Sequence, residues 1–286
     1  MCSSDLSLVQ SLALPVTDPD GAGPQRALVA SGTATSEGGL SRSVDGRYLL
    51  VPGYAAVSSS GSLANTNPAT VNRVVARVDG SGSVDSTTSF SDGGSNNIRS
   101  AASVDGSRFW VGTADGGVRT LAMGGNAGST GVSTLTNIRF VSISGGQLYA
   151  SSASGTSRLG TVGTGLPTTS GQAFTNLPGF PTGGGPYGFF LADLSASIPG
   201  DDTVYVADDT ASALRKYSLV GGSWTLNGTI GVDADDYRGL TGSVSGSTVT
   251  LFATRKGGSG STGGGELVTL TDGSGYNGAL TGTPTV

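Results

Sequence analysis

Short apolar segments alternate with glycine-rich turns along the chain, and no stretch shows the spacing of an amphipathic helix. Residues 43–51, with the sequence SVDGRYLLV, match residues 103–111, with the sequence SVDGSRFWV. The second half of this motif recurs three more times. The equivalent apolar positions are Leu50, Trp110, Tyr149, Tyr205 and Phe252. Their average interval is about 50 residues, which is typical of β-propeller blades of four strands each.

Each repeat predicts four short strands separated by turn residues. The first strands are expected at Gly39–Val44, Ile98–Val104, Ile138–Ser144, Phe189–Leu194 and Leu240–Val244, and the second strands carry the five apolar positions. The third strands are expected at Arg73–Val78, Val118–Ala122, Arg158–Val162, Leu214–Val220 and Leu267–Thr271. The fourth strands are expected at Val84–Phe90, Val132–Leu135, Ala173–Leu177, Trp224–Ile230 and Ala279–Val286. Glycine in the intervening turns supplies the positive φ angles of tight hairpins.

The pattern therefore predicts an all-β chain that forms a β-propeller. Residues Leu8–Leu14 alternate like a fourth strand that lacks its first three strands. We accordingly expect six blades with one blade incomplete, and seven blades is the alternative. Residues 7–286 are interpreted as a single propeller domain that is truncated at both ends. Residues 1–6, MCSSDL, resemble a translated sequencing adapter, and a native N-terminus is the alternative.

Two segments carry a resemblance to known repeats. Asp45–Val51 and Asp202–Asp208 look like YVTN and NHL-type propeller repeats, and Ala27–Ala55 resembles repeats of large, secreted, uncharacterised bacterial proteins. The resemblance covers most of residues 7–286 and implies the propeller fold. It also implies a location outside the cell or in the cell envelope, and a binding or scaffold role more often than catalysis.

Composition narrows the chemistry that the chain can perform. There is no histidine and one cysteine, Cys2, so an intrachain disulfide and a catalytic triad with histidine are excluded. The formal net charge is −5, which argues against a nucleic-acid partner. No apolar run is long enough to predict a transmembrane helix.

Three arginines, Arg99, Arg139 and Arg238, stand at or near the start of first strands. First strands line the central channel of a propeller, so these residues are predicted to surround one mouth of the channel. Guanidinium groups bind carboxylate or phosphate well. Glu37 precedes a first strand and is predicted at the same mouth. The alternative for all four is a structural role, in pairs or hydrogen bonds between blades.

Other candidate residues give weaker signals. Asp208 and Asp209 follow a second strand, and carboxylates at such a position can hold calcium, although aspartates in loops more often cap turns. Trp110, Tyr149, Tyr205 and Phe252 are expected in the core between blades. Tyr187 and Tyr237 precede first strands and are expected on an exposed face.

Two functions from different classes fit this pattern. The first is a non-catalytic secreted or cell-surface propeller that acts as a scaffold or binds a protein partner or small ligand through its loops. The alternative is a calcium-dependent hydrolase or lactonase on a six-bladed propeller. No catalytic residue, cofactor or metal ligand is assigned, and calcium remains the one cofactor considered.

Overall fold

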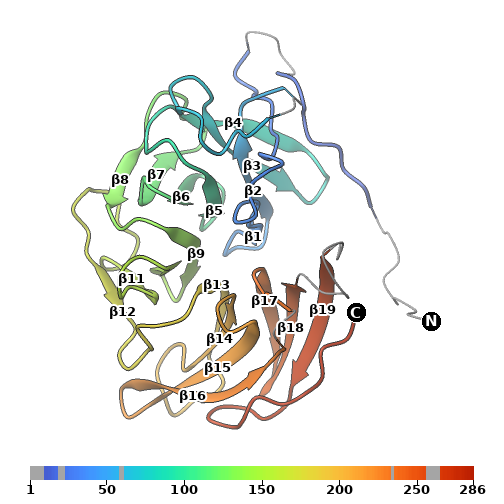
Figure 1. Cartoon of the computed structure of the whole chain (residues 1–286), viewed down its shortest axis with the longest axis vertical. Coiled ribbons are helices and arrows are strands. Elements are labelled where there is room, and N and C mark those ends of the chain that lie inside the picture. Colours follow the sequence, from blue (N-terminus) through green and yellow to red (C-terminus); the bar gives the residue numbers. More distant parts are fainter. Residues whose placement is uncertain (1–9, 19–22, 58–60, 233–234, 256–264) are drawn as a thin grey trace. The chain divides into compact units, whose positions relative to one another are not determined.

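The computed structural model describes residues 10–18, 23–57, 61–232, 235–255 and 265–286, and all regular structure in these ranges is β-strand (Figure 1). The strands form five antiparallel sheets, each built from strands that are consecutive along the chain. This arrangement is a β-propeller, so the predicted fold class is confirmed. The described residues include no helix that could cross a bilayer.

Each sheet forms one blade, and four of the five blades have four strands. Blade 1 contains β1 (Ser41–Arg42), β2 (Tyr48–Tyr54), β3 (Arg73–Asp79) and β4 (Val84–Phe90). Blade 2 contains β5 (Ile98–Ala102), β6 (Arg108–Thr113), β7 (Val118–Ala122) and β8 (Thr130–Ser133). Blade 3 contains β9 (Ile138–Ser144), β10 (Gln147–Ser152), β11 (Leu159–Val162) and β12 (Phe174–Asn176). Blade 4 contains β13 (Pro186–Ala192), β14 (Thr203–Asp208), β15 (Ala213–Val220) and β16 (Ser223–Ile230), and blade 5 contains β17 (Leu240–Ser245), β18 (Thr248–Arg255) and β19 (Glu266–Asp272).

The predicted number of blades is wrong, because the described residues form five blades rather than six or seven. Leu8 and Val9 lie outside the described residues, and residues 10–14 form no strand. The side chains of Gln10 and Leu12 lie beside the turn at Gly82, so this segment covers a hairpin instead of pairing with a strand. Alternating apolar residues predict a strand only where a partner edge is available.

The fourth strand of blade 5 is also missing where the sequence predicted it. Within Ala279–Val286 the backbone makes one bridge, between Thr285 and Thr269 of β19, with both N–H groups donating to the opposite carbonyl oxygens. Pro284 has no N–H to donate, and Gly282 has a φ of +104°, so neither supports a regular strand here.

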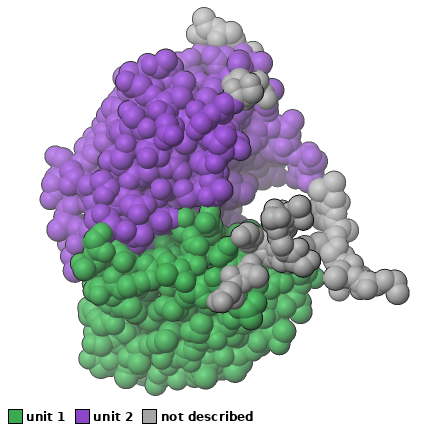
Figure 2. Space-filling model, viewed as in Figure 1, with its two compact units in different colours: residues 1–9, 155–160, 176–286 green, residues 10–154, 161–175 purple. Residues whose placement is uncertain are grey.

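The chain separates into two compact units (Figure 2). Among the described residues, the larger unit contains residues 10–154 and 161–175, and the smaller contains residues 155–160 and 176–286. The larger unit therefore holds blades 1 and 2 and most of blade 3. The smaller unit holds blades 4 and 5.

Apolar side chains from consecutive blades form the core within each unit. In the larger unit Leu50 belongs to a buried cluster with Ile98 and Phe109 of blade 2, and Trp110 belongs to a second cluster with Ile138 and Leu148 of blade 3. The indole N–H of Trp110 donates to the carbonyl oxygen of Pro167 at 2.8 Å. These contacts confirm that the repeat positions Leu50 and Trp110 pack between blades, whereas Tyr149 is only half-buried and belongs to neither cluster.

The repeat position in blade 5 behaves differently. Tyr205 is buried in the smaller unit against Leu251 and other blade 5 residues, but Phe252 is 38% exposed. The prediction that Phe252 lies in the core is therefore wrong. Leu50, Trp110 and Tyr205 are each covered by the blade that follows along the chain, and no described blade follows β19. Leu267 is on the same face of blade 5 and is 45% exposed.

Neighbouring first strands approach each other closely at two glycines. The N–H of Gly39 donates to the carbonyl oxygen of Arg99 at 2.9 Å, and that of Gly188 donates to the carbonyl oxygen of Arg238 at 2.8 Å. A Cβ atom on Gly188 would lie 2.6 Å from the Leu240 nitrogen and 2.7 Å from the Arg238 carbonyl oxygen. These positions accept glycine alone because main-chain atoms of the next blade occupy the space.

In three hairpin turns an aspartate side chain accepts hydrogen bonds from other residues of the same turn. Asp45, Asp79 and Asp105 each accept hydrogen bonds from a serine hydroxyl and a main-chain N–H within two residues. The hydroxyl of Ser81 contributes most to lowering the pKa of the exposed Asp79 carboxyl. Gly46, Gly82 and Gly106 supply the positive φ angles that the same turns need.

Candidate functional site

Arg99 lies at the loop end of the larger unit, where first strands begin and second strands end. The residue is buried, with 9% of its surface exposed. Nε donates to Asn97 Oδ1 at 3.1 Å, and Nη1 donates to Asn137 Oδ1 at 2.7 Å and to the Ile138 carbonyl oxygen at 3.2 Å. The guanidinium group therefore links the start of β5 to the start of β9.

Glu37 lies at the same end and orders the segment that enters blade 1. Its Oε1 accepts the N–H of Ser31 at 2.5 Å, and its Oε2 accepts the hydroxyl of Tyr54 at 2.7 Å. Burial raises the pKa of the Tyr54 hydroxyl far above its usual value, and the bond to Glu37 adds to the rise. Asn97, which accepts a bond from Arg99, also donates its amide N–H to Oγ of Ser36, the residue before Glu37, at 3.0 Å.

Arg73 is a third charged residue at the loop end, and the sequence did not single it out. It is 1% exposed at the start of β3. Its guanidinium group donates to the carbonyl oxygens of Thr66, Val71 and Asn96 and to Thr66 Oγ1, at 2.7–3.3 Å. It also lies over the Tyr54 ring, 4.9 Å from the centroid. Burial lowers the pKa of Arg73, and this network of oxygens is what offsets the cost of burying its charge.

The other two predicted arginines occupy different surroundings. Arg139 is half-buried on β9, next to the first strand that carries Arg99. Arg238 belongs to the smaller unit, where Nη2 lies 3.1 Å from Asp209 Oδ2 and the guanidinium group covers the Tyr187 ring at 4.9 Å from its centroid. Tyr187 and Tyr237 are 5% and 0% exposed, so the prediction that they lie on an exposed face is wrong. Ligand binding by the four predicted residues stays a prediction.

The aspartates considered as calcium ligands are used in local structure. Asp208 accepts the N–H groups of Gly185 and Ala211 and forms an ion pair with Arg215 at 2.9 Å. Asp209 is paired with Arg238, and Asp235, another loop aspartate of this unit, forms an ion pair with Arg255 at 3.1 Å. Across the described ranges, no three residues among aspartate, glutamate and cysteine are placed to share a metal ion.

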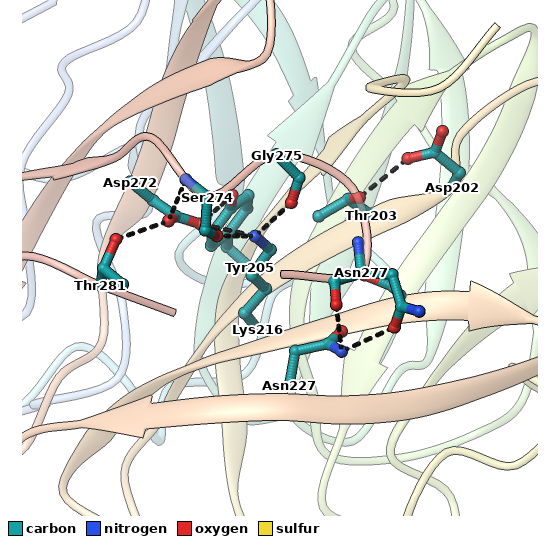
Figure 3. A network of polar contacts seen from close by, with 11 residues as sticks. Asp202, Thr203, Tyr205, Lys216, Asn227, Asp272, Ser274, Gly275, Asn277 and Thr281 are labelled. Carbon is teal, nitrogen blue, oxygen red and sulfur yellow. Dashed lines mark hydrogen bonds and ion pairs between the residues drawn. The ribbon is translucent and has the colours of Figure 1, made fainter. Parts of the chain in front are cut away.

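A buried polar network joins blades 4 and 5 in the smaller unit (Figure 3). Lys216 Nζ on β15 donates to Asp272 Oδ2 at 2.7 Å, to Ser274 Oγ at 2.7 Å and to the Gly275 carbonyl oxygen at 2.6 Å. Tyr205 donates its hydroxyl to the same carboxylate at 2.7 Å. All three ammonium protons have acceptors, and the Lys216 and Asp272 side chains are fully buried, so the network is structural rather than a site for substrate.

A cleft of about 390 Å³ opens at the opposite, hairpin end of blade 1. It lies between the turn that joins β1 to β2, the turn that joins β3 to β4, and the preceding segment at residues 10–12. Its polar and aromatic lining includes Arg42, Arg47, Tyr48, Asp79 and Gln10, and its apolar lining includes Leu12 and Leu49.

Two arginines in this cleft differ from those at the loop end. Arg42 and Arg47 are exposed, and neither forms an ion pair with any described residue. Arg42 Nε donates to the Gly46 carbonyl oxygen at 2.9 Å, which fixes the direction of its guanidinium group. Arg47 lies 5.4 Å from the centroid of the Tyr48 ring. The hydroxyl of Ser43 contributes most to lowering the pKa of the nearby Asp45 carboxyl, and the charge of Arg47 adds to this effect. Neither guanidinium group is in direct contact with a described carboxylate.

Tyr48 provides a rigid wall for the cleft. The Arg77 guanidinium lies 4.7 Å from the ring centroid, and Arg77 is itself held by the Gly106 carbonyl oxygen at 3.0 Å and by Asp85 at 3.3 Å. A Cβ atom on Gly106 would lie 2.7 Å from Tyr48 Cδ2, so the ring also packs closely against the adjoining turn of blade 2. The sequence did not indicate this cleft, because its lining comes from three separate segments.

Comparison with known proteins supports the fold. No model of a known protein family and no curated protein matches the sequence. A proposed 6-phosphogluconolactonase from Bacteroides uniformis has a similar structure, with a TM-score of 0.55 and 16% identity over 86% of this chain and 70% of that chain. A second such protein, from Bacteroides fragilis, gives 0.52 and 14% over 85% and 68%. The WD40 domain of coronin from Toxoplasma gondii gives 0.52 and 12% over 91% and 62%. At these identities the similarity shows the propeller fold alone.

Proposed function

We propose that this chain is a non-catalytic propeller module that binds a partner or ligand, outside the cell or in the cell envelope. The cleft at the hairpin end of blade 1 carries the proposal. It places the exposed guanidinium groups of Arg42 and Arg47 in a concave surface beside apolar side chains. Oriented charge next to apolar surface is the arrangement of a binding site.

The buried charged residues outside the cleft have structural roles, which supports a binding function over catalysis. The loops at the loop end of the larger unit are held by hydrogen bonds of Glu37, Arg73 and Arg99. Blades 4 and 5 are held together by Lys216 and Asp272. These groups stabilise a rigid scaffold, and binding residues commonly lie on the surface of such a scaffold. The proposed location rests on the resemblance of residues 27–55 to repeats of secreted bacterial proteins.

A lactone hydrolase is the second candidate, and the names proposed for the two Bacteroides structures favour it. The calcium-dependent form of this reaction would use the metal ion to polarise the substrate carbonyl, with carboxylates as its ligands. In this chain the described aspartates that were considered for that role cap turns or pair with arginine.

The two functions are separated by one pair of measurements on the whole chain. The first is hydrolysis of 6-phosphogluconolactone, with and without added calcium, followed by proton release. We expect the rate of the buffer alone. The second is calorimetric titration with calcium, for which we expect no stoichiometric heat. Catalysed hydrolysis, with or without calcium, would overturn the proposed function in favour of the lactonase.

A further inference from the structure

We infer that the cleft of blade 1 binds an acidic peptide segment in which an apolar side chain stands beside a carboxylate. The inference rests on the proposed function and names the ligand class for it. Its basis is that one concave surface holds two exposed arginines, which form no ion pair with a described residue, and two exposed leucines. Leu12 is 42% exposed and Leu49 is 41% exposed.

The cationic part of the cleft is suited to carboxylates. Elsewhere in the described chain Arg77, Arg119, Arg215, Arg238 and Arg255 each have an acidic partner. Arg42 and Arg47 form no ion pair with a described residue, and both line the cleft. Arg42 uses Nε on the Gly46 carbonyl oxygen, and its Nη2 packs against Gly46, so the hydrogens of Nη1 and Nη2 that this contact does not use are the donors for a carboxylate.

The lining also contains one acidic residue, Asp79. Its Oδ1 accepts the N–H and hydroxyl of Ser81 and the N–H of Ser83, at 2.6–3.0 Å. These bonds lower the pKa of Asp79 and hold its carboxylate in the turn. A carboxylate ligand would therefore be attracted to Arg42 and Arg47 and repelled by Asp79, which places it on the two arginines.

The apolar part of the cleft selects a peptide over a sugar acid. Sugars are recognised by stacking on an open aromatic face, but the Tyr48 ring is approached by the guanidinium groups of Arg47 and Arg77. The remaining contact surface is aliphatic and comes from Leu12 and Leu49. A volume of about 390 Å³ lies at the lower end of the range for small-ligand sites, which suits a short segment of peptide.

The test is an amide chemical-shift titration of the isotopically labelled full chain. The probe is the blocked tripeptide Asp-Leu-Asp, and its uncharged counterpart Asn-Leu-Asn is the control. We expect saturable shifts at Arg42, Arg47 and Leu49 with the acidic peptide, and a Kd weaker by about tenfold or more with the uncharged one. Binding should weaken as salt rises, because exposed ion pairs are screened.

The matched variants are R42Q/R47Q and R158Q. Arg158 also donates to main-chain carbonyl oxygens of its own loop, at 2.7–3.0 Å, but lies outside the cleft. We expect the double variant to lose binding by about tenfold or more, with R158Q unchanged. Equal affinity in R42Q/R47Q, equal affinity for both peptides, or shifts with inorganic phosphate but not with the peptide would each overturn the inference. Lactone hydrolysis is measured separately, so failure of the peptide site is distinguishable from failure of the proposed function.

Discussion

Lys216 Nζ lies 2.7 Å from Asp272 Oδ2, and both side chains are fully buried between blades 4 and 5. Lys216 belongs to β15 and Asp272 ends β19, so the pair ties two sheets to each other. Burial alone would raise the pKa of the Asp272 carboxyl, but hydrogen bonds from Lys216, Ser274 and Tyr205 outweigh it and lower the pKa. These hydrogen-bond partners keep the buried Asp272 carboxyl ionised.

Replacing Lys216 with methionine should therefore destabilise the smaller unit strongly. The change keeps the length of the side chain and leaves Asp272 with a buried charge that has lost its counterion, at a cost of about 3–5 kcal/mol. Urea unfolding followed by tryptophan fluorescence measures the loss. The control is D85N in the half-exposed pair with Arg77, which should cost about 1 kcal/mol or less. Similar losses in the two variants would contradict a structural role for the buried network.

Alkaline pH should unfold the protein through its buried tyrosines. Burial raises the pKa of Tyr205 well above the ordinary value of 10.0, and its bond to Asp272 adds to the rise; Tyr54 behaves in the same way with Glu37. A raised folded pKa means that the stabilisation is complete below the unfolded pKa and is lost as pH rises above it. Stability should therefore fall above pH 10.

Tyrosinate absorbance and circular dichroism, recorded through the same alkaline titration, test this. We expect the hydroxyl groups of Tyr54 and Tyr205 to ionise only together with the loss of β-structure. The Y205F variant should lose less stability between neutral and alkaline pH than the unaltered chain. Full ionisation of all tyrosines before any structural change would refute the prediction.

Gly188→Ala should destabilise the contact between blades 4 and 5. The added methyl group would meet main-chain atoms of Arg238 and Leu240 at 2.7 and 2.6 Å, so the two first strands must move apart. Such overpacking costs about 1–3 kcal/mol. Gly183→Ala is the matched control, since nothing lies within 4 Å of its added Cβ atom. The measurement is the thermal unfolding midpoint of both variants. An unchanged midpoint for Gly188→Ala would show that the strands can separate without loss of stability.

The exposed face of blade 5 should promote self-association. Phe252 and Leu267 are exposed beside Thr254 and Thr269 on one uncharged surface. Exposed apolar surface of this kind favours association at high concentration. The F252T/L267T variant should sediment as a smaller species than the unaltered chain at the same concentration. V286T changes another exposed apolar residue and serves as the control.

The sequence predicted the blades well because the repeat is local. Ile138–Ser144, Val118–Ala122 and Val84–Phe90 agree with β9, β7 and β4 at both ends. Each of these strands is specified by its own apolar residues and by the glycine turns beside it. The repeat also predicted which side chains pack between blades, and it failed at Phe252 because burial there depends on a following blade.

The candidate sites were less predictable because they depend on residues far apart in sequence. Arg99 was recognised by its place in the repeat, but its partner Asn137 belongs to the next blade. Lys216 and Asp272 carry no local signal, since their contact exists only when β15 and β19 are in place. The cleft joins Gln10 to Gly82 across a separation that no motif spans.

The turns at Asp45, Asp79 and Asp105 have a consequence for how such a chain can grow. Each carboxylate is satisfied by the serine and the main chain of its own turn. A duplicated gene segment that carries this turn therefore encodes the hydrogen-bond partners of its aspartate wherever it is inserted. The chain can lengthen by copying blades first, and surface residues such as Arg42 and Arg47 are then free to diverge.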